Sequence, residues 1–322
     1  MQHLEIYHRE VENQINQLQL SNNPPELYEP IRYLLSNGGK RIRPLLSMLS
    51  CQLFGKPGLS ALHAGVAVEL FHNFTLIHDD IMDKAPLRRG KTSVHIKWSE
   101  NSALLSGDTL FVVAYRELIK HDAKFLPELI PVFSKTAQEV CEGQQMDMDF
   151  ETRDEVSIDE YIEMIRLKTA VLLAGALEMG AIIGEANTKN RQHIYRFGEH
   201  IGIAFQLQDD LLDVYADSKT FGKQVGGDII ANKKTFLLLK AKELSNSEQS
   251  AVFVELEHEN NHEVKVSRTK ELFEQLGVRA LAKEEMTRHF QLSLKHLSQI
   301  EASDESKQPL KMLAHMLMDR EQ

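Results

Sequence analysis

The sequence is poor in cysteine, with only Cys51 and Cys141 among its 322 residues. Two cysteines cannot form the disulfide framework of a small secreted domain, so we expect a reducing compartment, the cytoplasm. No stretch reaches the roughly 18 consecutive apolar residues that predict a membrane span. The first five residues also lack the basic start and the apolar run of a secretory signal peptide.

Positive charge is scarce as well. Lys and Arg number 37 against 47 Asp and Glu, which gives a net charge of −10. This balance argues against a nucleic-acid binder, which depends on cationic contacts to phosphate, and it fits a protein that recruits cations. No alternating strand pattern and no linker rich in Pro, Gly or Ser is present. With 42% hydrophobic residues, we predict a single all-α domain that spans residues 1–322.

Turn residues and the spacing of apolar residues divide the chain into helices. The predicted helices cover residues 1–20, 26–36, 44–53, 60–83, 100–121, 126–149, 158–185, 189–216, 232–244, 269–298 and 310–318. The basic stretch 86–91 is predicted to be a loop, and the polar runs 245–248, 257–263 and 301–309 are predicted to be exposed connections. The helix 60–83 is apolar nearly all round, which is typical of a buried helix.

Two copies of one acidic motif stand out, and each lies in an apolar helical run. The predicted metal ligands are Asp79, Asp80 and Asp83 in the first copy and Asp209, Asp210 and Asp213 in the second. Residues four apart share a helix face, so the outer two carboxylates of each copy repel one another and need nearby positive charge. One such motif alone is typical of a solvated surface. Two copies in apolar surroundings favour Mg²⁺, which binds carboxylates together with substrate phosphates.

Basic residues follow both motifs, and clustered Arg and Lys side chains suit phosphate oxygens. A third group, Lys40, Arg41 and Arg43, lies on a Gly-rich stretch with no acidic run beside it, so it could bind a phosphate without metal. Any one of these residues alone is typical of solvated surface. The clustering favours phosphate contact for Arg88, Arg89 and Lys223, and more weakly for Lys234.

Several polar residues interrupt apolar helices, and spacing alone leaves their function and their packing about equally supported. They are Gln144, Asp147, Lys168, Thr169 and Gln206, whereas His72, seven residues before Asp79, is more typical of a core histidine. No Ser–His–acid set, Cys–His pair or Walker-type loop is evident. The chemistry is therefore predicted to be metal-assisted loss of a leaving group rather than attack by a protein nucleophile.

In order and spacing, these motifs resemble those of the trans-isoprenyl diphosphate synthases, the farnesyl and geranylgeranyl diphosphate synthase group. The resemblance covers about residues 30–240 and includes Gly38–Pro44, Asp79–Asp83, Leu87–Gly90, Gly143-Gln144, Lys168-Thr169, Phe205-Gln206, Asp209–Asp213, Gly222-Lys223 and Asn232-Lys233. It implies an isoprenoid synthase fold, which is a helical bundle around a central cavity with the two acidic motifs facing each other across its mouth. It also implies a homodimer.

The resemblance further implies the role of each residue. Three Mg²⁺ ions would join the acidic motifs to an allylic diphosphate, which would also contact Arg88, Lys168, Thr169, Gln206, Lys223 and Lys233. Isopentenyl diphosphate would bind without metal to Lys40, Arg43, His72 and Arg89. Lys168, Thr169 and Gln206 would be catalytic: the polar oxygens of Thr169 and Gln206 would stabilise an allylic cation, which isopentenyl diphosphate attacks head to tail. The released diphosphate would remove the proton.

Product length depends, by the same resemblance, on the residues just before the first acidic motif. Phe74 and Thr75, with Phe71, would form the floor under the growing chain. One aromatic residue at these two positions, and no insertion in the motif, predicts a C20 product, with C15 second and longer chains as a further alternative. By helix geometry alone, Phe74 lies about 140° around the helix from Asp79.

Three other interpretations account for part of the sequence. A class I terpene cyclase also uses an acidic helix motif and Mg²⁺, but it needs no isopentenyl diphosphate site, so Lys40, Arg43 and Arg89 weigh against it. A non-catalytic subunit of a heteromeric prenyl synthase is expected to lose an acidic motif, and both are intact here. A plain all-α scaffold leaves both motifs unexplained.

Overall fold

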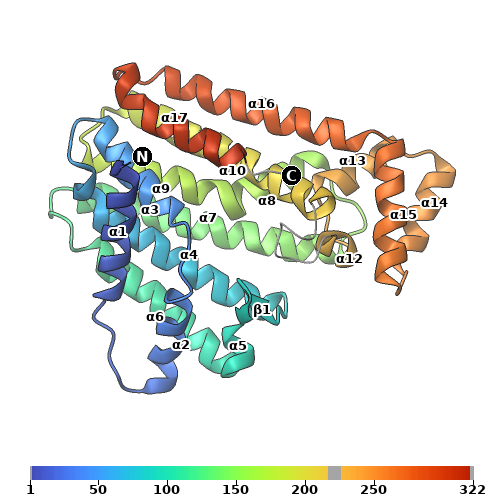
Figure 1. The fold of residues 1–322 in the computed structure, drawn as a ribbon, viewed down its shortest axis with the longest axis horizontal. Helices are drawn as coiled ribbons and strands as arrows, with labels where there is room; N and C mark the ends of the chain where they lie inside the picture. Colours follow the sequence, from blue (N-terminus) through green and yellow to red (C-terminus); the bar gives the residue numbers. More distant parts are fainter. Residues whose placement is uncertain (1, 217–225, 320–322) are drawn as a thin grey trace. The chain divides into compact units, whose positions relative to one another are not determined.

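The computed structural model describes residues 2–216 and 226–319. Within these ranges the elements are helical except for one short hairpin (Figure 1), which confirms the all-α class. The helices form two compact units. Unit 1 comprises residues 1–137, 175–195 and 300–310, and unit 2 comprises residues 138–174, 196–299 and 311–322. That the chain forms a single domain stays a prediction.

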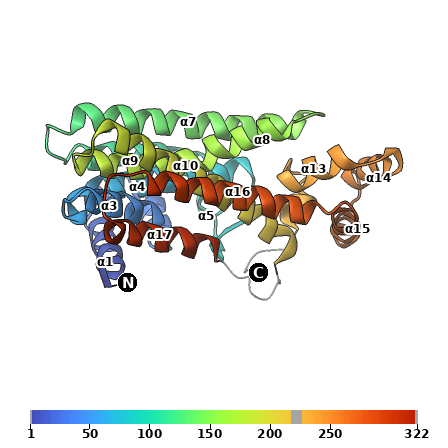
Figure 2. The ribbon, with the colours of Figure 1, turned by 90° about the horizontal axis from the view of Figure 1, so that it is seen from above.

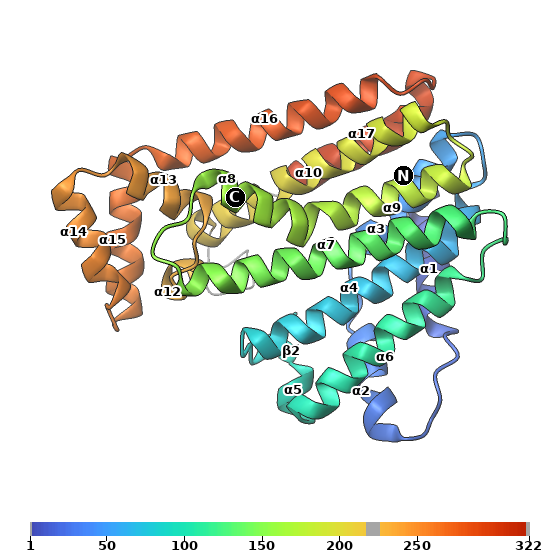
Figure 3. The ribbon, with the colours of Figure 1, turned by 180° about the vertical axis from the view of Figure 1, so that it is seen from behind.

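Unit 1 is built around one buried helix, α4 (Leu62–Met82). Because its apolar residues lie all round the helix, α4 packs on three neighbours: α6 (Glu100–Leu118), α1 (Gln2–Asn16) and α3 (Ile42–Leu53). Figure 3 shows α4 and α6 side by side. A Cβ atom on Gly65 would lie 2.9 Å from the Cα atom of Pro44, so only glycine lets α4 approach α3 this closely.

Unit 2 contains most of the C-terminal helices. Its elements are α8 (Ile158–Ile165), η2 (Arg166–Ala170), α12 (Gly227–Ile230), α13 (Phe236–Leu244), α14 (Ser247–Glu257), α15 (His262–Gln275) and α16 (Val278–Ser298). Parts of α7 (Leu126–Thr152), α9 (Val171–Ile183), α10 (Thr188–Tyr215) and α17 (Asp304–Met318) belong to it too. Within this unit, α13, α14 and α15 lie together (Figure 2).

The remaining elements of unit 1 are short or peripheral. They are α2 (Pro25–Leu35), η1 (Gly58–Ala61), β1 (Leu87–Arg88), β2 (Lys91–Thr92) and α5 (Val94–Lys97). The stretch 86–91 was predicted to be a loop, and this is corrected: Arg88 pairs with Lys91 in an antiparallel hairpin. Both residues of its turn have positive φ, 52° at Arg89 and 73° at Gly90. Four-residue helices such as α5 and α12 are too short to leave a periodic pattern.

Other predicted boundaries are also wrong, and the clearest cases have a local reason. The helix predicted at 158–185 is interrupted by η2, a turn of π-helix. Residues 247–257 form α14, which begins with a capping box at Asn246 and Gln249. The helix predicted at 269–298 is two helices, because Gly277 takes a left-handed φ of 67° between α15 and α16. The last helix begins earlier than predicted, at Asp304, and contains Pro309.

Among the helices of the described residues, none is both long and apolar enough to cross a membrane.

Candidate active site

The first acidic motif lies at the C-terminal end of α4, and its three carboxylates differ in exposure. Asp79 is half-buried, Asp83 is exposed and caps the helix, and Asp80 is only 1% exposed. The amide of Asp83 donates to the Asp79 carbonyl over 2.8 Å, which keeps the two residues one helical turn apart on the same face. The two outer carboxylates are thus the accessible pair.

Asp80 is paired inside the protein. Arg88, on strand β1, donates to one Asp80 oxygen from Nε at 2.9 Å and from a terminal nitrogen at 2.5 Å. Burial raises the pKa of Asp80, and the Arg88 guanidinium works against that rise. The hairpin therefore brings in positive charge of the kind that the acidic motif was predicted to need. The predicted contact of Arg88 with the allylic diphosphate stays a prediction.

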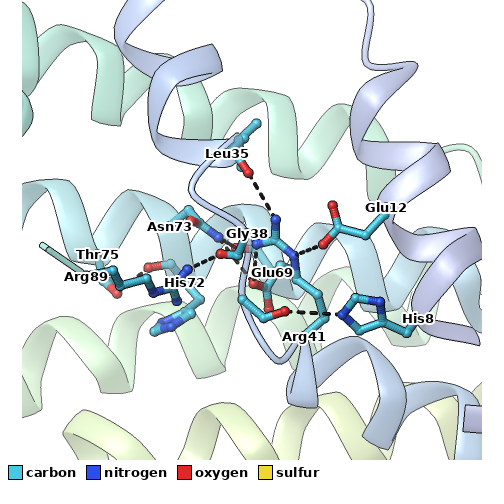
Figure 4. Close-up of polar contacts among 11 residues, drawn as sticks. His8, Glu12, Leu35, Gly38, Arg41, Glu69, His72, Asn73, Thr75 and Arg89 are labelled. Atoms are coloured by element: carbon cyan, nitrogen blue, oxygen red, sulfur yellow. Dashed lines mark hydrogen bonds and ion pairs between the residues drawn. The ribbon is translucent and has the colours of Figure 1, made fainter. Parts of the chain in front are cut away.

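Three of the four residues predicted to bind isopentenyl diphosphate influence one another within unit 1. Arg89 donates to the Gly38 carbonyl, and His72 lies beside it (Figure 4). Burial, followed by the charges of Arg43 and Arg89, lowers the pKa of His72 well below its usual value, so the imidazole is neutral at pH 7. The fourth residue, Lys40, is exposed on the same Gly-rich stretch.

Arg43 is the clearest candidate in this group for an anion ligand. Among the described residues, no atom accepts a hydrogen bond from its buried Nε. A buried donor without an acceptor costs about 1–3 kcal/mol, and a bound diphosphate oxygen would satisfy it. The donor set of this group therefore fits a phosphorylated ligand.

Arg41 does not belong to this group, although the sequence placed it with Lys40 and Arg43 as a phosphate-binding cation. That interpretation is wrong, because Arg41 is only 2% exposed and its guanidinium is paired with Glu12 and Glu69. Neither carboxylate was predicted from the sequence. Glu69 carries one available signal, a charged residue in an otherwise apolar helix.

The second acidic motif lies in the last turns of α10, and its middle carboxylate is also buried. Asp210 is 5% exposed, accepts a hydrogen bond from the Tyr161 hydroxyl and accepts another from Gln206 at 3.1 Å. Burial, together with the charge of Asp228, raises the pKa of Asp210 well above its usual value. Tyr161 was not predicted. Asp209 and Asp213 are half-buried, and Asp213 accepts the Asp228 amide at 3.0 Å.

Two predicted lysines of unit 2 converge on one carboxylate. Lys168 lies in the π-helical turn η2, and its Nζ is 2.6 Å from Asp147, while the Nζ of Lys233 is 3.5 Å from the same oxygen. Burial alone would raise the pKa of Asp147, but the two ammonium groups outweigh it and the pKa is lowered. Such π turns are frequent at functional sites. Asp147 thus holds two of the cations predicted to bind the allylic diphosphate.

The two predicted cation-stabilising residues are joined to each other and to the acidic motif. The Thr169 hydroxyl donates to the side-chain oxygen of Gln206 over 3.1 Å, and the Gln206 amide donates to Asp210. A Cβ atom on Gly143 would lie 2.7 Å from the Cα atom of Lys168, so glycine there lets α7 pass close to η2. These two hydrogen bonds fix the orientation of the Gln206 amide, with its oxygen toward Thr169 and its nitrogen toward Asp210.

The C-terminal helices, which the resemblance left without a role, support the segment that carries Lys233. Lys265 on α15 is 4% exposed, and its Nζ donates to the Ile230 carbonyl at 3.2 Å. Asn232 donates to the Glu257 carbonyl at the end of α14 over 3.1 Å. Lys265 escaped prediction, because a lysine buried in a polar helix gives no signal in a single sequence, whereas Asn232 was noted only as part of the Asn232-Lys233 motif.

The predicted floor residue Phe74 belongs to an aromatic cluster in unit 1. It is 8% exposed and stacks on Phe111 of α6 at a centroid distance of 5.1 Å. Phe71, Tyr115 and Phe133 complete the cluster. The Thr75 hydroxyl instead donates to the carbonyl of His72, so its side chain is engaged along the helix. Phe111 and Tyr115 are four residues apart in the sequence, and this helical spacing could have identified them as members of the aromatic cluster.

Mg²⁺ fits the donors of the two acidic motifs, since each offers two carboxylates one helical turn apart. In the described part of the chain, no three His, Cys, Asp or Glu side chains are already grouped to hold a metal ion. The predicted ligand Lys223 lies outside the described residues. The metal-binding and substrate-binding roles of all the predicted site residues stay predictions.

Comparison with known proteins gives concordant matches. The family model for polyprenyl synthetase matches residues 24–276. A geranylgeranyl diphosphate synthase of Methanosarcina mazei is 44% identical over 235 residues, 72% of either chain. The crystal structure of a geranylgeranyl pyrophosphate synthetase from Pyrococcus horikoshii superposes with a TM-score of 0.94 at 33% identity, covering 99% of this chain and 98% of the other. A polyprenyl synthase from Caulobacter crescentus, solved with calcium and isoprenyl diphosphate, gives 0.87 at 27% identity over 99% and 96%.

Proposed function

Because the chain belongs to the polyprenyl synthetase family and has the isoprenoid synthase fold, we propose that it makes geranylgeranyl diphosphate (C20). It is a trans-prenyltransferase of the short-chain prenyl diphosphate synthases. The proposed reaction is the head-to-tail condensation of isopentenyl diphosphate with an allylic diphosphate. The observation that supports it most directly is that two groups of side chains able to bind an anion occur: cations beside the acidic motifs, and the Arg43, His72 and Arg89 group without such a motif.

In the proposed mechanism, the allylic diphosphate is held by the protein through Lys168 and Lys233. Asp147 pairs with both ammonium groups and so holds them close to each other. Mg²⁺ bound by Asp79, Asp83, Asp209 and Asp213, three ions by the resemblance, would supply the Lewis-acid charge that lets the diphosphate leave. Thr169 and Gln206 present oxygen atoms to the allylic cation, and their hydrogen bond limits how far those oxygens can turn away.

Isopentenyl diphosphate binds, in the same proposal, to Lys40, Arg43 and Arg89, with His72 as a neutral donor. A neutral imidazole can donate a hydrogen bond to phosphate without adding to the repulsion among the guanidinium groups. This site has no carboxylate pair of the kind found in the acidic motifs, so we expect binding there to need no metal. The nucleophilic double bond is then delivered by a substrate whose diphosphate stays intact.

Product length tests the C20 assignment. With isopentenyl diphosphate, a C5, C10 or C15 primer and Mg²⁺, the wild-type protein is expected to stop at C20 when the products are separated by chain length. Phe74→Ala removes the ring that stacks on Phe111, and it is expected to shift the main product to C25 or longer, because the floor is lowered. A Phe253→Ala variant, which opens a buried aromatic pair in unit 2, is the control that should keep C20. Unchanged products from Phe74→Ala would contradict the floor.

We also propose that the protein is a homodimer through α6. Leu105 and Val112 are 57% and 59% exposed, and they lie seven residues apart on one stripe of that helix with Leu104 beside them. An apolar stripe of this kind marks an interaction surface. Light scattering should give twice the mass of one chain, and Val112→Glu should lower it to one. Val254→Glu, equally exposed at 59% on α14, should leave it doubled. A monomeric wild type would contradict the proposal.

A further inference from the structure

Arg41 occupies an unusual position between two residues predicted to bind isopentenyl diphosphate. Its φ of 48° lies in the left-handed region, which non-glycine residues adopt only at a cost of about 1–2 kcal/mol. Its side chain turns inward, donating to Glu12 at 2.7 Å, to Glu69 at 2.9 Å and to the Leu35 carbonyl at 3.0 Å (Figure 4). Strain of this kind persists only where surrounding contacts fix it, and it is concentrated at functional sites.

The pairing of Arg41 with Glu69 affects the charge available to a substrate. Glu69 is 2% exposed, and its carboxylate acts electrostatically on both Arg43 and Arg89. An unpaired carboxylate at this place would compete with a diphosphate for those two guanidinium groups. Arg41 binds Glu69 directly and so leaves the positive charge of Arg43 and Arg89 for the ligand.

Helix α1 supplies the second anchor of the same stretch. Glu12 holds the Arg41 Nε, and His8, one turn earlier, lies 3.2 Å from the Gly39 carbonyl through Nε2. Both contacts come from residues that precede the range matched by the family model, 24–276. The Gly-rich stretch 38–43 is therefore tied at Gly39 and at Arg41, on either side of Lys40.

We propose that Arg41 and Glu12 are positioning residues for the isopentenyl diphosphate site. They hold the stretch 38–43 in its strained form and keep Glu69 from pairing with Arg43 and Arg89. Neither residue touches the substrate. This inference rests on the proposed function for the identity of the ligand. It predicts a change in the affinity for isopentenyl diphosphate and no change in the affinity for the allylic diphosphate.

The test is Glu12→Ala, because Glu12 is partly exposed and alanine favours the helix, so that the fold is retained. We expect the KM for isopentenyl diphosphate to rise about tenfold, the usual range for losing a residue that orients a ligand-binding group. The kcat and the KM for the allylic diphosphate should stay within twofold of wild type. Glu12→Gln keeps an oxygen that can accept from Arg41, and it should recover most of the affinity.

Glu10→Ala is the matched control. Glu10 lies on the same helix with similar side-chain exposure, 32% against 29%, and within the described part of the chain it forms an ion pair only with the adjacent Arg9. An unchanged KM for isopentenyl diphosphate in Glu12→Ala, or an equal rise in Glu10→Ala, would overturn the inference. A parallel rise in both substrate KM values with a lowered Tm would also overturn it, since that is the effect of general destabilisation.

Calorimetric titration of isopentenyl diphosphate without metal separates this inference from the proposed function. If the wild-type protein binds it and Glu12→Ala binds it about tenfold more weakly, the inference holds even where no condensation occurs. If the wild-type protein condenses the substrates and the two proteins bind isopentenyl diphosphate equally, the proposed function holds and the inference is overturned.

Discussion

Asp79→Ala is expected to lower kcat by about a thousandfold, which corresponds to roughly 4 kcal/mol of lost transition-state stabilisation. Asp79 is the half-buried member of the first acidic motif, and it shares a helix face with the exposed Asp83. A lone Asp83 offers one carboxylate where Mg²⁺ bound with a diphosphate normally uses one or two. The loss should therefore appear in the rate of diphosphate release at saturating substrate.

The control for this variant is Asp154→Ala, which removes an exposed carboxylate outside both motifs. It is expected to keep the wild-type rate. The Tm of Asp79→Ala should not fall, because removal of one of two repelling carboxylates on a helix face does not destabilise the helix. A rate for Asp79→Ala near that of wild type would contradict the metal-binding role of the first motif.

The second large effect is expected for Lys168→Met, which should lower kcat/KM for the allylic diphosphate by about 10²- to 10³-fold. Lys168 is the nearer of the two cations on Asp147, at 2.6 Å, and its side chain is 28% exposed, so it can reach a ligand. The KM for isopentenyl diphosphate should not change, because we assign that substrate to a different set of residues. Steady-state kinetics with each substrate varied in turn measure this difference.

Lys311→Met provides the comparison, since Lys311 is an exposed lysine of α17 in unit 2. Its kinetics are expected to match those of wild type. Lys233 still faces Asp147 in the Lys168→Met variant, so the carboxylate keeps one cation and the fold should survive. Equal losses of affinity for both diphosphates, or no loss for either, would contradict the proposed division between the two substrates.

The two acidic motifs share an arrangement of buried and accessible carboxylates that their sequences do not reveal. In each, the middle carboxylate is buried and hydrogen-bonded by a side chain from outside the motif, and the outer two carboxylates are more accessible. The partners differ: Asp80 has the cation Arg88, whereas Asp210 has the neutral donors Tyr161 and Gln206. In the first arrangement the Arg88 guanidinium favours an ionised Asp80, whereas in the second, burial and the charge of Asp228 raise the pKa of Asp210 well above its usual value.

Much of the fold could be predicted because its signals are local. The helix 60–83 was recognisable from its apolar residues and from Pro86 beyond its end, and the motif spacing placed Asp79 and Asp83 on one face. Helix ends that depend on a single capping residue were missed, as at Asn246 and Gly277. Asn and Gly are typical of loops, but at these two positions they begin or divide helices.

The site was less predictable, because its important pairs are distant in sequence. The inward orientation of the Arg41 side chain depends on Glu12 and Glu69, which lie 29 and 28 residues away in the sequence. The partner of Lys168 is Asp147, and neither residue indicates the other without the π-helical turn that joins α8 to α9. Spacing found the residues able to do chemistry, but only the fold shows which of them pair with each other.

The most direct test of the central claim is one assay with purified protein, isopentenyl diphosphate and the C15 allylic diphosphate, with Mg²⁺ or with a chelator. We expect C20 product and inorganic diphosphate to form in equal amounts with Mg²⁺, and neither to form with the chelator. Diphosphate release without isopentenyl incorporation, or no reaction with Mg²⁺ and any primer, would contradict the account and would favour a cyclase or a non-catalytic subunit.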